Sequence, residues 1–236
     1  MPPLYVESDH YVTTRLFSQY DEPYQPSPYL LHLALDMARE VEHVRLEELA
    51  TRPAIESRML LQWPGEHYKM LAALVRTLKP KRIVEIGTLH GWSALSMKEY
   101  LPEDGRIDAF DILEWNKFTD SAFQQSDFTD GRLVYHVEDL TDPAVVAHNH
   151  DTLANADLVF LDGPHDGDTE YRMIENFRKV KFVKNPVFVF DDIKMNDMLK
   201  FWRDLPLPKM DITSFGHYSG TGIAEWKWPE NAARFV

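Results

Sequence analysis

The sequence contains no cysteine, and this absence excludes several kinds of site. Without cysteine there is no disulfide framework, no thiolate nucleophile and no cysteine-ligated zinc or iron–sulfur centre. Any metal ion must therefore be bound by oxygen atoms or by histidine.

Positive charge is also scarce. The 236 residues include 25 Lys and Arg against 38 Asp and Glu, which gives a formal net charge of -13, and no basic stripe is set apart along the chain. Such a chain would repel a phosphate backbone. We therefore expect a small-molecule substrate and no nucleic acid partner.

Long apolar runs are missing as well. No stretch approaches the roughly 20 apolar residues of a membrane span. Residues 1–10 carry acids and prolines where a secretory signal needs a basic patch followed by an apolar run. We therefore expect no membrane partner and a cytoplasmic location.

The spacing of apolar residues changes near residue 80. Before that point Leu, Met and Ala recur at three- and four-residue intervals, which predicts helices over residues 28–48 and 66–78. After it, short apolar runs alternate with helix-like segments and predict strands at 82–86, 106–111, 132–137, 157–161 and 187–190. Two further strand candidates flank a Gly-containing turn within 209–228 and predict an antiparallel hairpin.

This alternation predicts an α/β fold. We expect a Rossmann-like, seven-stranded, mostly parallel sheet with helices on both faces and an antiparallel last strand. An N-terminal extension with lid helices, residues 1–60, would precede a ligand-binding domain over 61–236. The aromatic-rich start of this extension is compatible with a lid or with the arm of a homodimer.

The turn after the first predicted strand carries a ligand-binding pattern. In residues 85–93 (EIGTLHGWS), two glycines four apart allow a tight turn close to a ligand before a helix begins. The pattern lacks the third glycine of the dinucleotide fingerprint, so a ligand without a pyrophosphate fits it better. Asp111, at the end of the second strand, stands where an acid accepts ribose hydroxyls. Together they indicate an adenosyl ligand, with a purely structural turn as the alternative.

Three carboxylates follow the fourth and fifth predicted strands, namely Asp162, Asp191 and Asp192. Parallel strands end at the same edge of a sheet, so we expect these side chains to be neighbours. Crowded carboxylates repel one another and raise their own pKa values, whereas Mg²⁺, Ca²⁺ or Mn²⁺ would neutralise them. Alternatively, one or two of them cap the following helices.

Residues 63–97 (WPGEHYKMLAALVRTLKPKRIVEIGTLHGWSALSM) resemble the catechol and caffeoyl-CoA O-methyltransferase group of class I S-adenosylmethionine-dependent enzymes. LVFLDGPH, VFVFDDI and GIAEWKW resemble that group's metal-binding strand ends and its final strand, so the resemblance covers about residues 60–228. It implies S-adenosylmethionine as cofactor and Mg²⁺ or another divalent cation. The residues implied for the methionine portion are Glu85, Gly87, Gly91 and Ser93, with Asp111 for the ribose, Asp139 for the adenine, and Asp162, Asp191 and Asp192 for the metal.

The sequence departs from this group at three positions. His165 stands where catechol methyltransferases have a lysine base and some macrolide sugar methyltransferases have a histidine, which makes it the candidate base. Trp92 replaces the usual tyrosine, and Asp192 replaces the asparagine common in the catechol enzymes. The expected acceptor is a vicinal diol of a natural-product sugar or polyketide, or a catechol, and the histidine favours the former.

Three other functions remain open from the sequence. A nicotinamide-dependent oxidoreductase would use the same sheet and Asp111, but it lacks the third glycine and has no need of the acid cluster. A metal-dependent hydroxylase or hydrolase-like relative could use the same fold for another reaction. A non-catalytic adenosyl-binding protein would be expected to lose the metal ligands or the base.

Overall fold

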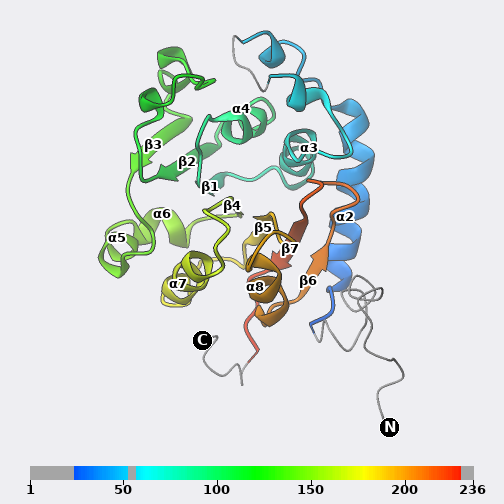
Figure 1. Ribbon diagram of the computed structural model, residues 1–236, viewed down its shortest axis with the longest axis vertical. Coiled ribbons are helices and arrows are strands. Elements are labelled where there is room, and N and C mark those ends of the chain that lie inside the picture. The colour runs from blue at the N-terminus through cyan, green and yellow to red at the C-terminus, as the bar shows by residue number, and fades with distance from the viewer. Residues whose placement is uncertain (1–23, 53–56, 230–236) are drawn as a thin grey trace.

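The computed structural model describes residues 24–52 and 57–229, which form one seven-stranded sheet in the order β3-β2-β1-β4-β5-β7-β6 (Figure 1). The strands are β1 Arg82–Ile86, β2 Arg106–Asp111, β3 Leu133–Val137, β4 Leu158–Leu161, β5 Val187–Asp191, β6 Lys209–Asp211 and β7 Thr221–Glu225. Strands β1 to β5 pair in parallel, and β7 lies antiparallel to both β5 and β6. The predicted Rossmann-like α/β fold with an antiparallel last strand is confirmed.

Helices cover both faces of this sheet (Figure 1). One face carries α2 Pro28–Glu40, α3 Tyr68–Leu78 and α4 Trp92–Lys98, and the other carries α5 Pro143–His148, α6 His150–Ala154, α7 Asp168–Phe177 and α8 Met198–Asp204. Short 3₁₀ turns lie at Val41–His43, Leu49–Thr51, Ser57–Leu61, Trp115–Lys117 and Gln125–Phe128. Among the residues described, no helix is both long and apolar enough to cross a bilayer.

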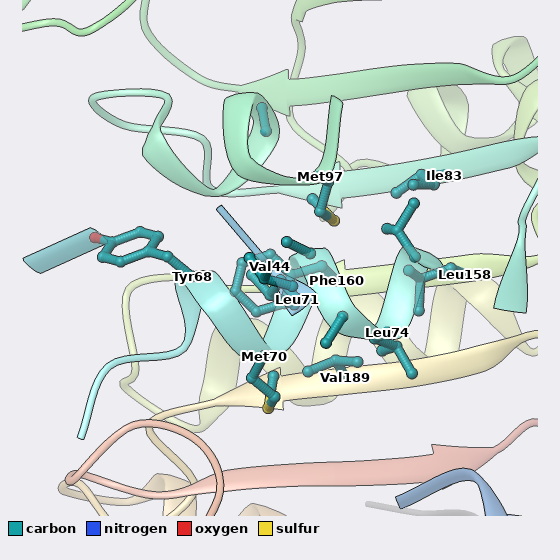
Figure 2. Packing of buried hydrophobic residues seen from close by; sticks show 14 of the residues in the cluster. Val44, Tyr68, Met70, Leu71, Leu74, Ile83, Met97, Leu158, Phe160 and Val189 are labelled. Atoms are coloured by element: carbon teal, nitrogen blue, oxygen red, sulfur yellow. The ribbon is translucent and has the colours of Figure 1, made fainter. Parts of the chain in front are cut away.

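The strands are apolar on both sides because each face packs against helices. On β1, Ile83 belongs to the core beneath α2, α3 and α4, whereas Val84 belongs to the core beneath α5 to α8. Figure 2 shows Leu71 of α3 packed among Phe160 and other strand residues of the first core. Two buried faces fix the register of the sheet, since a one-residue slip would exchange the two sets of side chains. The positions of the strand ends are fixed in the same way.

The segment before the sheet is joined to the first core. Ser27 caps the N-terminus of helix α2, because its Oγ accepts the backbone N–H of Leu30 at 3.2 Å, and Leu33 and Met37 of this helix are buried in that core. The helix is shorter than predicted, because the chain becomes extended at Val44 and continues across the core. A division at residue 60 stays a prediction, as does a lid or dimer arm formed by the N-terminal extension, of which residues 1–23 lie outside the described part of the chain.

Candidate active site

The turn after β1 brings the ends of β1 and β4 into contact. Gly87 and Gly91 have φ angles of +81° and +88°, a region that side chains other than glycine rarely adopt. A Cβ on Gly87 would lie 1.7 Å from the backbone oxygen of Asp162, and one on Gly91 would lie 2.4 Å from the ring of Phe123. Both glycines of the predicted pattern are therefore required by close packing as well as by backbone conformation.

A cavity of about 430 Å³ opens at the carboxyl ends of β1 to β4. Asp111 lines it, and the two oxygens of this carboxylate accept the N–H groups of Leu89 and Leu113 at 2.9 and 3.0 Å. Each oxygen keeps a lone pair for a ligand hydroxyl. Asp139 also lines the cavity, with one oxygen accepting the N–H of Thr141 at 2.8 Å. The acidic lining residues Asp111, Glu138, Asp139 and Asp162 outnumber the one lining arginine, Arg172, so the cavity favours a cationic ligand over an anionic one.

A second, smaller cavity of about 40 Å³ lies on the other side of the turn. Gly91 and Ser93 line it, together with His67. Gly87 and Asp162 line both cavities, so the two adjoin at these residues. The turn after β1 is therefore bordered by one large and one small cavity.

Glu85 is placed differently from the other predicted cofactor residues. Its side chain is fully buried, it lines neither cavity, and neither carboxylate oxygen makes a hydrogen bond. Burial raises the pKa of Glu85 to about 8, although the nearby hydroxyls of Ser93 and Thr88 act in the opposite direction. The folded protein therefore holds this carboxyl in its neutral form at neutral pH.

We expect the Glu85→Gln protein to be more stable than the wild type at neutral pH. The unfolded chain releases the Glu85 proton near pH 4.5 and the folded chain near pH 8, so between these values the folded state binds more protons and its stability falls as pH rises. The loss is at most about 1.4 kcal/mol for each pH unit, or about 3 kcal/mol at pH 7. Urea unfolding at about pH 5 and pH 7.5 measures the difference.

The exposed Glu103→Gln substitution is the matched control and should change stability little at either pH. A difference between Glu85→Gln and wild type that stays constant from pH 5 to 7.5 would contradict the raised pKa of Glu85.

The three predicted carboxylates gather at the ends of β4 and β5, and His165 lies between two of them. Its Nε2 is 3.0 Å from Oδ1 of Asp162, and its Nδ1 is 3.2 Å from Oδ2 of Asp192. Both His165 and Asp192 have positive φ angles, of 60° and 55°. Strained backbone of this kind is characteristic of functional sites.

The electrostatic environment of His165 favours its protonated form. Burial by itself lowers the pKa of His165, but the hydrogen bond to Asp162 and the charges of Asp162, Asp192 and Asp191 together outweigh burial and raise it. Burial and the charge of Asp191 raise the pKa of Asp162, against the opposing effect of His165. In this cluster each ring nitrogen of His165 faces a different carboxylate.

The structure adds two histidines that the carboxylate pattern did not reveal. Nδ1 of His67 lies 3.1 Å from Oδ2 of Asp191, and Nδ1 of His217 lies 3.2 Å from the same oxygen. Nδ1 of His217 is also 3.1 Å from Oδ1 of Asp192, whose Oδ1 accepts the hydroxyl of Ser219. Burial by itself lowers the pKa of His217, but Asp191 and Asp192 raise it to about 10. The acid cluster is therefore a mixed cluster of carboxylates and imidazoles.

The donor set of this cluster fits a divalent cation. Among the residues described, His67, Asp191 and His217 each offer a ligand atom within 4.8 Å of the others. Carboxylate oxygens and imidazole nitrogens are common ligands of divalent metals. A metal ion is therefore compatible with the side chains present.

The sheet, the glycine turn and the cavity at the strand ends are typical of Rossmann-like proteins that bind a nucleoside-containing ligand at this edge. The sequence profile of the O-methyltransferase family matches residues 36–194. This match covers more than half of the chain, and the chain belongs to the O-methyltransferase family.

Individual relatives agree with this assignment. The caffeoyl-CoA O-methyltransferase of Populus kitakamiensis is 36% identical over 72 residues, which are 30% of this chain and 31% of the relative. The chain therefore matches about a third of the length of this curated relative.

Solved structures share the fold. The O-methyltransferase of Bacillus cereus in complex with SAH gives a TM-score of 0.52 at 16% identity, over 81% of this chain and 90% of its own. An SAH-bound methyltransferase of Podospora anserina gives 0.51 at 17% identity, over 96% of this chain and 100% of its own. At these identities the similarity establishes the fold alone.

Proposed function

We propose that this protein transfers the methyl group of S-adenosylmethionine to a hydroxyl oxygen of a small molecule, with the help of a divalent cation such as Mg²⁺. The observation that carries the proposal is the position of Asp162, which lines both cavities and also contacts His165 in the carboxylate cluster. A cofactor in the two cavities would therefore have its reactive end beside the cluster. Membership of the O-methyltransferase family supports this reaction.

The charge of the cavities favours this cofactor over NAD. S-adenosylmethionine carries a positive sulfonium centre, whereas NAD carries a pyrophosphate. Four carboxyl-bearing residues line the larger cavity, and the turn lacks the third glycine that receives a pyrophosphate. Asp111 would hold the ribose, Asp139 would line the adenine, and Gly87, Gly91 and Ser93 would surround the methionine portion. Glu85, buried behind the turn, would act on that portion only through its neighbours.

His165 is the proposed base. In this proposal neutral His165 would accept the proton of the acceptor hydroxyl, while S-adenosylmethionine would supply the methyl group and leave as S-adenosylhomocysteine. A cation that neutralises the carboxylates would lower the pKa of His165 and free one ring nitrogen for the hydroxyl, while the remaining carboxylate contact would orient the ring. A divalent cation bound by Asp162, Asp191 and Asp192 would lower the pKa of the acceptor hydroxyl and orient a vicinal diol. Positioning accounts for most of the rate in such an in-line displacement.

The acceptor is a vicinal diol in this proposal. A sugar or polyketide diol is favoured over a catechol because the proposed base is a histidine. A hydroxylase or hydrolase-like relative that used the same carboxylates for another reaction would leave the acidic cofactor cavity without a role.

Calorimetric titration tests the cofactor first. Purified protein is titrated with S-adenosylmethionine and with NAD, each with and without Mg²⁺. We expect S-adenosylmethionine to bind with one site per chain and NAD not to bind. Transfer of a labelled methyl group to a panel of sugar diols and catechols, with Mg²⁺ or with chelator, then identifies the acceptor class.

Absence of S-adenosylmethionine binding under both conditions would overturn the proposed function. Binding of NAD in its place would favour the oxidoreductase. Binding of S-adenosylmethionine with methyl transfer unchanged by chelator would retain the methyltransferase and remove the cation from it.

A further inference from the structure

A group of three side chains, two buried and one partly buried, lies at the end of β5, and one of its members lines the smaller cavity. It consists of His67, Asp191 and His217, and we call it the histidine–aspartate trio. Each member offers one ligand atom within 4.8 Å of the others. The imidazole rings of His67 and His217 lie edge to face, with centroids 5.2 Å apart, and both approach the same carboxylate oxygen.

The fold holds the trio rigidly although its members are far apart in the sequence. Just before His67, Gly65 pairs with the segment that carries His217: its N–H donates to Gly216 at 3.2 Å, and its oxygen accepts from Tyr218 at 3.1 Å. Asp191 ends β5 and lies opposite Thr221, the first residue of β7. All three side chains therefore extend from backbone that is fixed by main-chain pairing.

Hydrogen bonding leaves part of the trio unexplained. Nδ1 of His67 is buried and makes no hydrogen bond, although it lies 3.1 Å from Oδ2 of Asp191. Nε2 of His217 is likewise buried without a hydrogen bond, and it lies 3.5 Å from Oε2 of Glu66. Both nitrogens thus face a carboxylate oxygen without hydrogen-bond geometry, and a bound cation would satisfy them. Two side chains that bind the same ion lie close together without a hydrogen bond between them, and His67 and Asp191 are arranged in this way.

Asp191 is also the member of the carboxylate cluster that is not in contact with His165. His165 lies 3.0 Å from Asp162 and 3.2 Å from Asp192, and so separates these two carboxylates. The nearest additional ligand atoms for Asp191 are therefore nitrogens of His67 and His217.

We propose that His67, Asp191 and His217 together bind one first-row transition-metal ion, such as Mn²⁺, Co²⁺ or Zn²⁺, in preference to Mg²⁺. Imidazole is a good ligand for these ions, whereas Mg²⁺ prefers oxygen and loses its bound water reluctantly. Two nitrogens and one carboxylate leave open positions where a diol could bind. This ligand set shares Asp191 with the three-carboxylate site of the proposed function and would replace it. The inference rests on the proposed function only for the role of the ion beside the methyl acceptor.

Metal binding is tested on the full-length, chelator-treated protein without cofactor or acceptor. Co²⁺ is titrated and followed by its visible absorption, and Mn²⁺, Zn²⁺ and Mg²⁺ are titrated by calorimetry. We expect one Co²⁺ per chain and Mg²⁺ affinity at least about 100-fold weaker than that for Zn²⁺. His67→Asn and His217→Asn should each weaken Co²⁺ binding at least about 100-fold. The matched control is His150→Asn, which removes a half-exposed imidazole on α6 and should bind Co²⁺ like the wild type.

A second measurement does not depend on the folding of the variants. Pulsed electron paramagnetic resonance of the Mn²⁺-loaded wild type should show couplings to imidazole ¹⁴N. Their absence, or Mg²⁺ binding as tight as Zn²⁺ binding, would overturn the inference in favour of a site made of carboxylates. Unchanged Co²⁺ binding in both folded histidine variants would overturn it as well.

The same preparations separate this inference from the proposed function. If the trio binds Co²⁺ but S-adenosylmethionine does not bind, the proposed function fails and the metal site stands. If S-adenosylmethionine binds and no transition metal does, the metal site fails and the methyltransferase stands.

Discussion

The Asp191→Asn protein is expected to lose methyl transfer while it keeps its cofactor. Asp191 is buried at the end of β5, contacts His67 and His217, and lines neither cavity. Asparagine preserves the shape but removes the charge that holds a cation. We expect kcat to fall at least about 1000-fold, as when a group that stabilises developing charge is removed. The Kd for S-adenosylmethionine should change by less than about threefold, which is under 1 kcal/mol. Transfer of labelled methyl and calorimetry measure the two quantities.

Two further variants sharpen this result. Asp162→Asn should weaken cofactor binding as well as transfer, because Asp162 lines both cavities. Asp204→Asn, in the half-exposed last turn of α8, should change neither. Equal losses of transfer and cofactor binding in Asp191→Asn would mean that Asp191 supports the cofactor cavity, and the proposed division of roles would be wrong.

Gly87→Ala should have the largest effect on stability. Its Cβ would lie 1.7 Å from the backbone oxygen of Asp162, and its φ of +81° is already unfavourable for alanine. This oxygen cannot retreat easily, because the N–H of Asp162 donates to Ile86 at 2.9 Å and ties the end of β4 to β1. We expect the free energy of unfolding to fall by about 4 kcal/mol or more, the range of severe backbone and packing defects. Urea denaturation measures it.

The Gly131→Ala variant separates the two effects that act at Gly87, which are the steric overlap of the new Cβ and the unfavourable backbone conformation. Gly131 has a similar φ of +69°, and a Cβ there would meet no atom within 4 Å. Its replacement should lower the free energy of unfolding by only about 1 kcal/mol, which is the cost of placing an alanine in the left-handed backbone conformation. Similar losses in the two variants would show that the close approach of β1 and β4 contributes little.

Local pattern was sufficient to predict most of the sheet. The unbroken apolar run 187–190, for example, indicated a strand buried on both faces, and β5 is buried throughout. The same rule for strand ends predicted that Asp162 and Asp191 would be close together, because the carboxyl ends of adjacent parallel strands share an edge. The first helix was less predictable, since its apolar spacing continues beyond Glu40 while the backbone becomes extended at Val44 to follow the core.

The partners of the carboxylates could not be predicted in this way. His67 precedes a helix on one side of the sheet, and His217 lies in the turn before the last strand, 150 residues later. One signal existed for His217, because an antiparallel β7 must begin where β5 ends, but the sequence does not state that β7 pairs with β5. For His67 the pairing of Gly65 with the His217 segment is decisive, and no local pattern encodes it.

The sequence by itself determined the class of fold, the glycine turn and the edge of the sheet at which acids gather, because these depend on hydrophobic periodicity and on backbone rules that act over a few residues. Only the tertiary structure decided that Glu85 is buried behind the turn, that His165 separates Asp162 from Asp192, and that two distant histidines meet at Asp191. The physical reason is that burial and the neighbours of a charged group are set by how separate elements pack. The chemistry of a charged group depends on those neighbours at distances of a few ångströms.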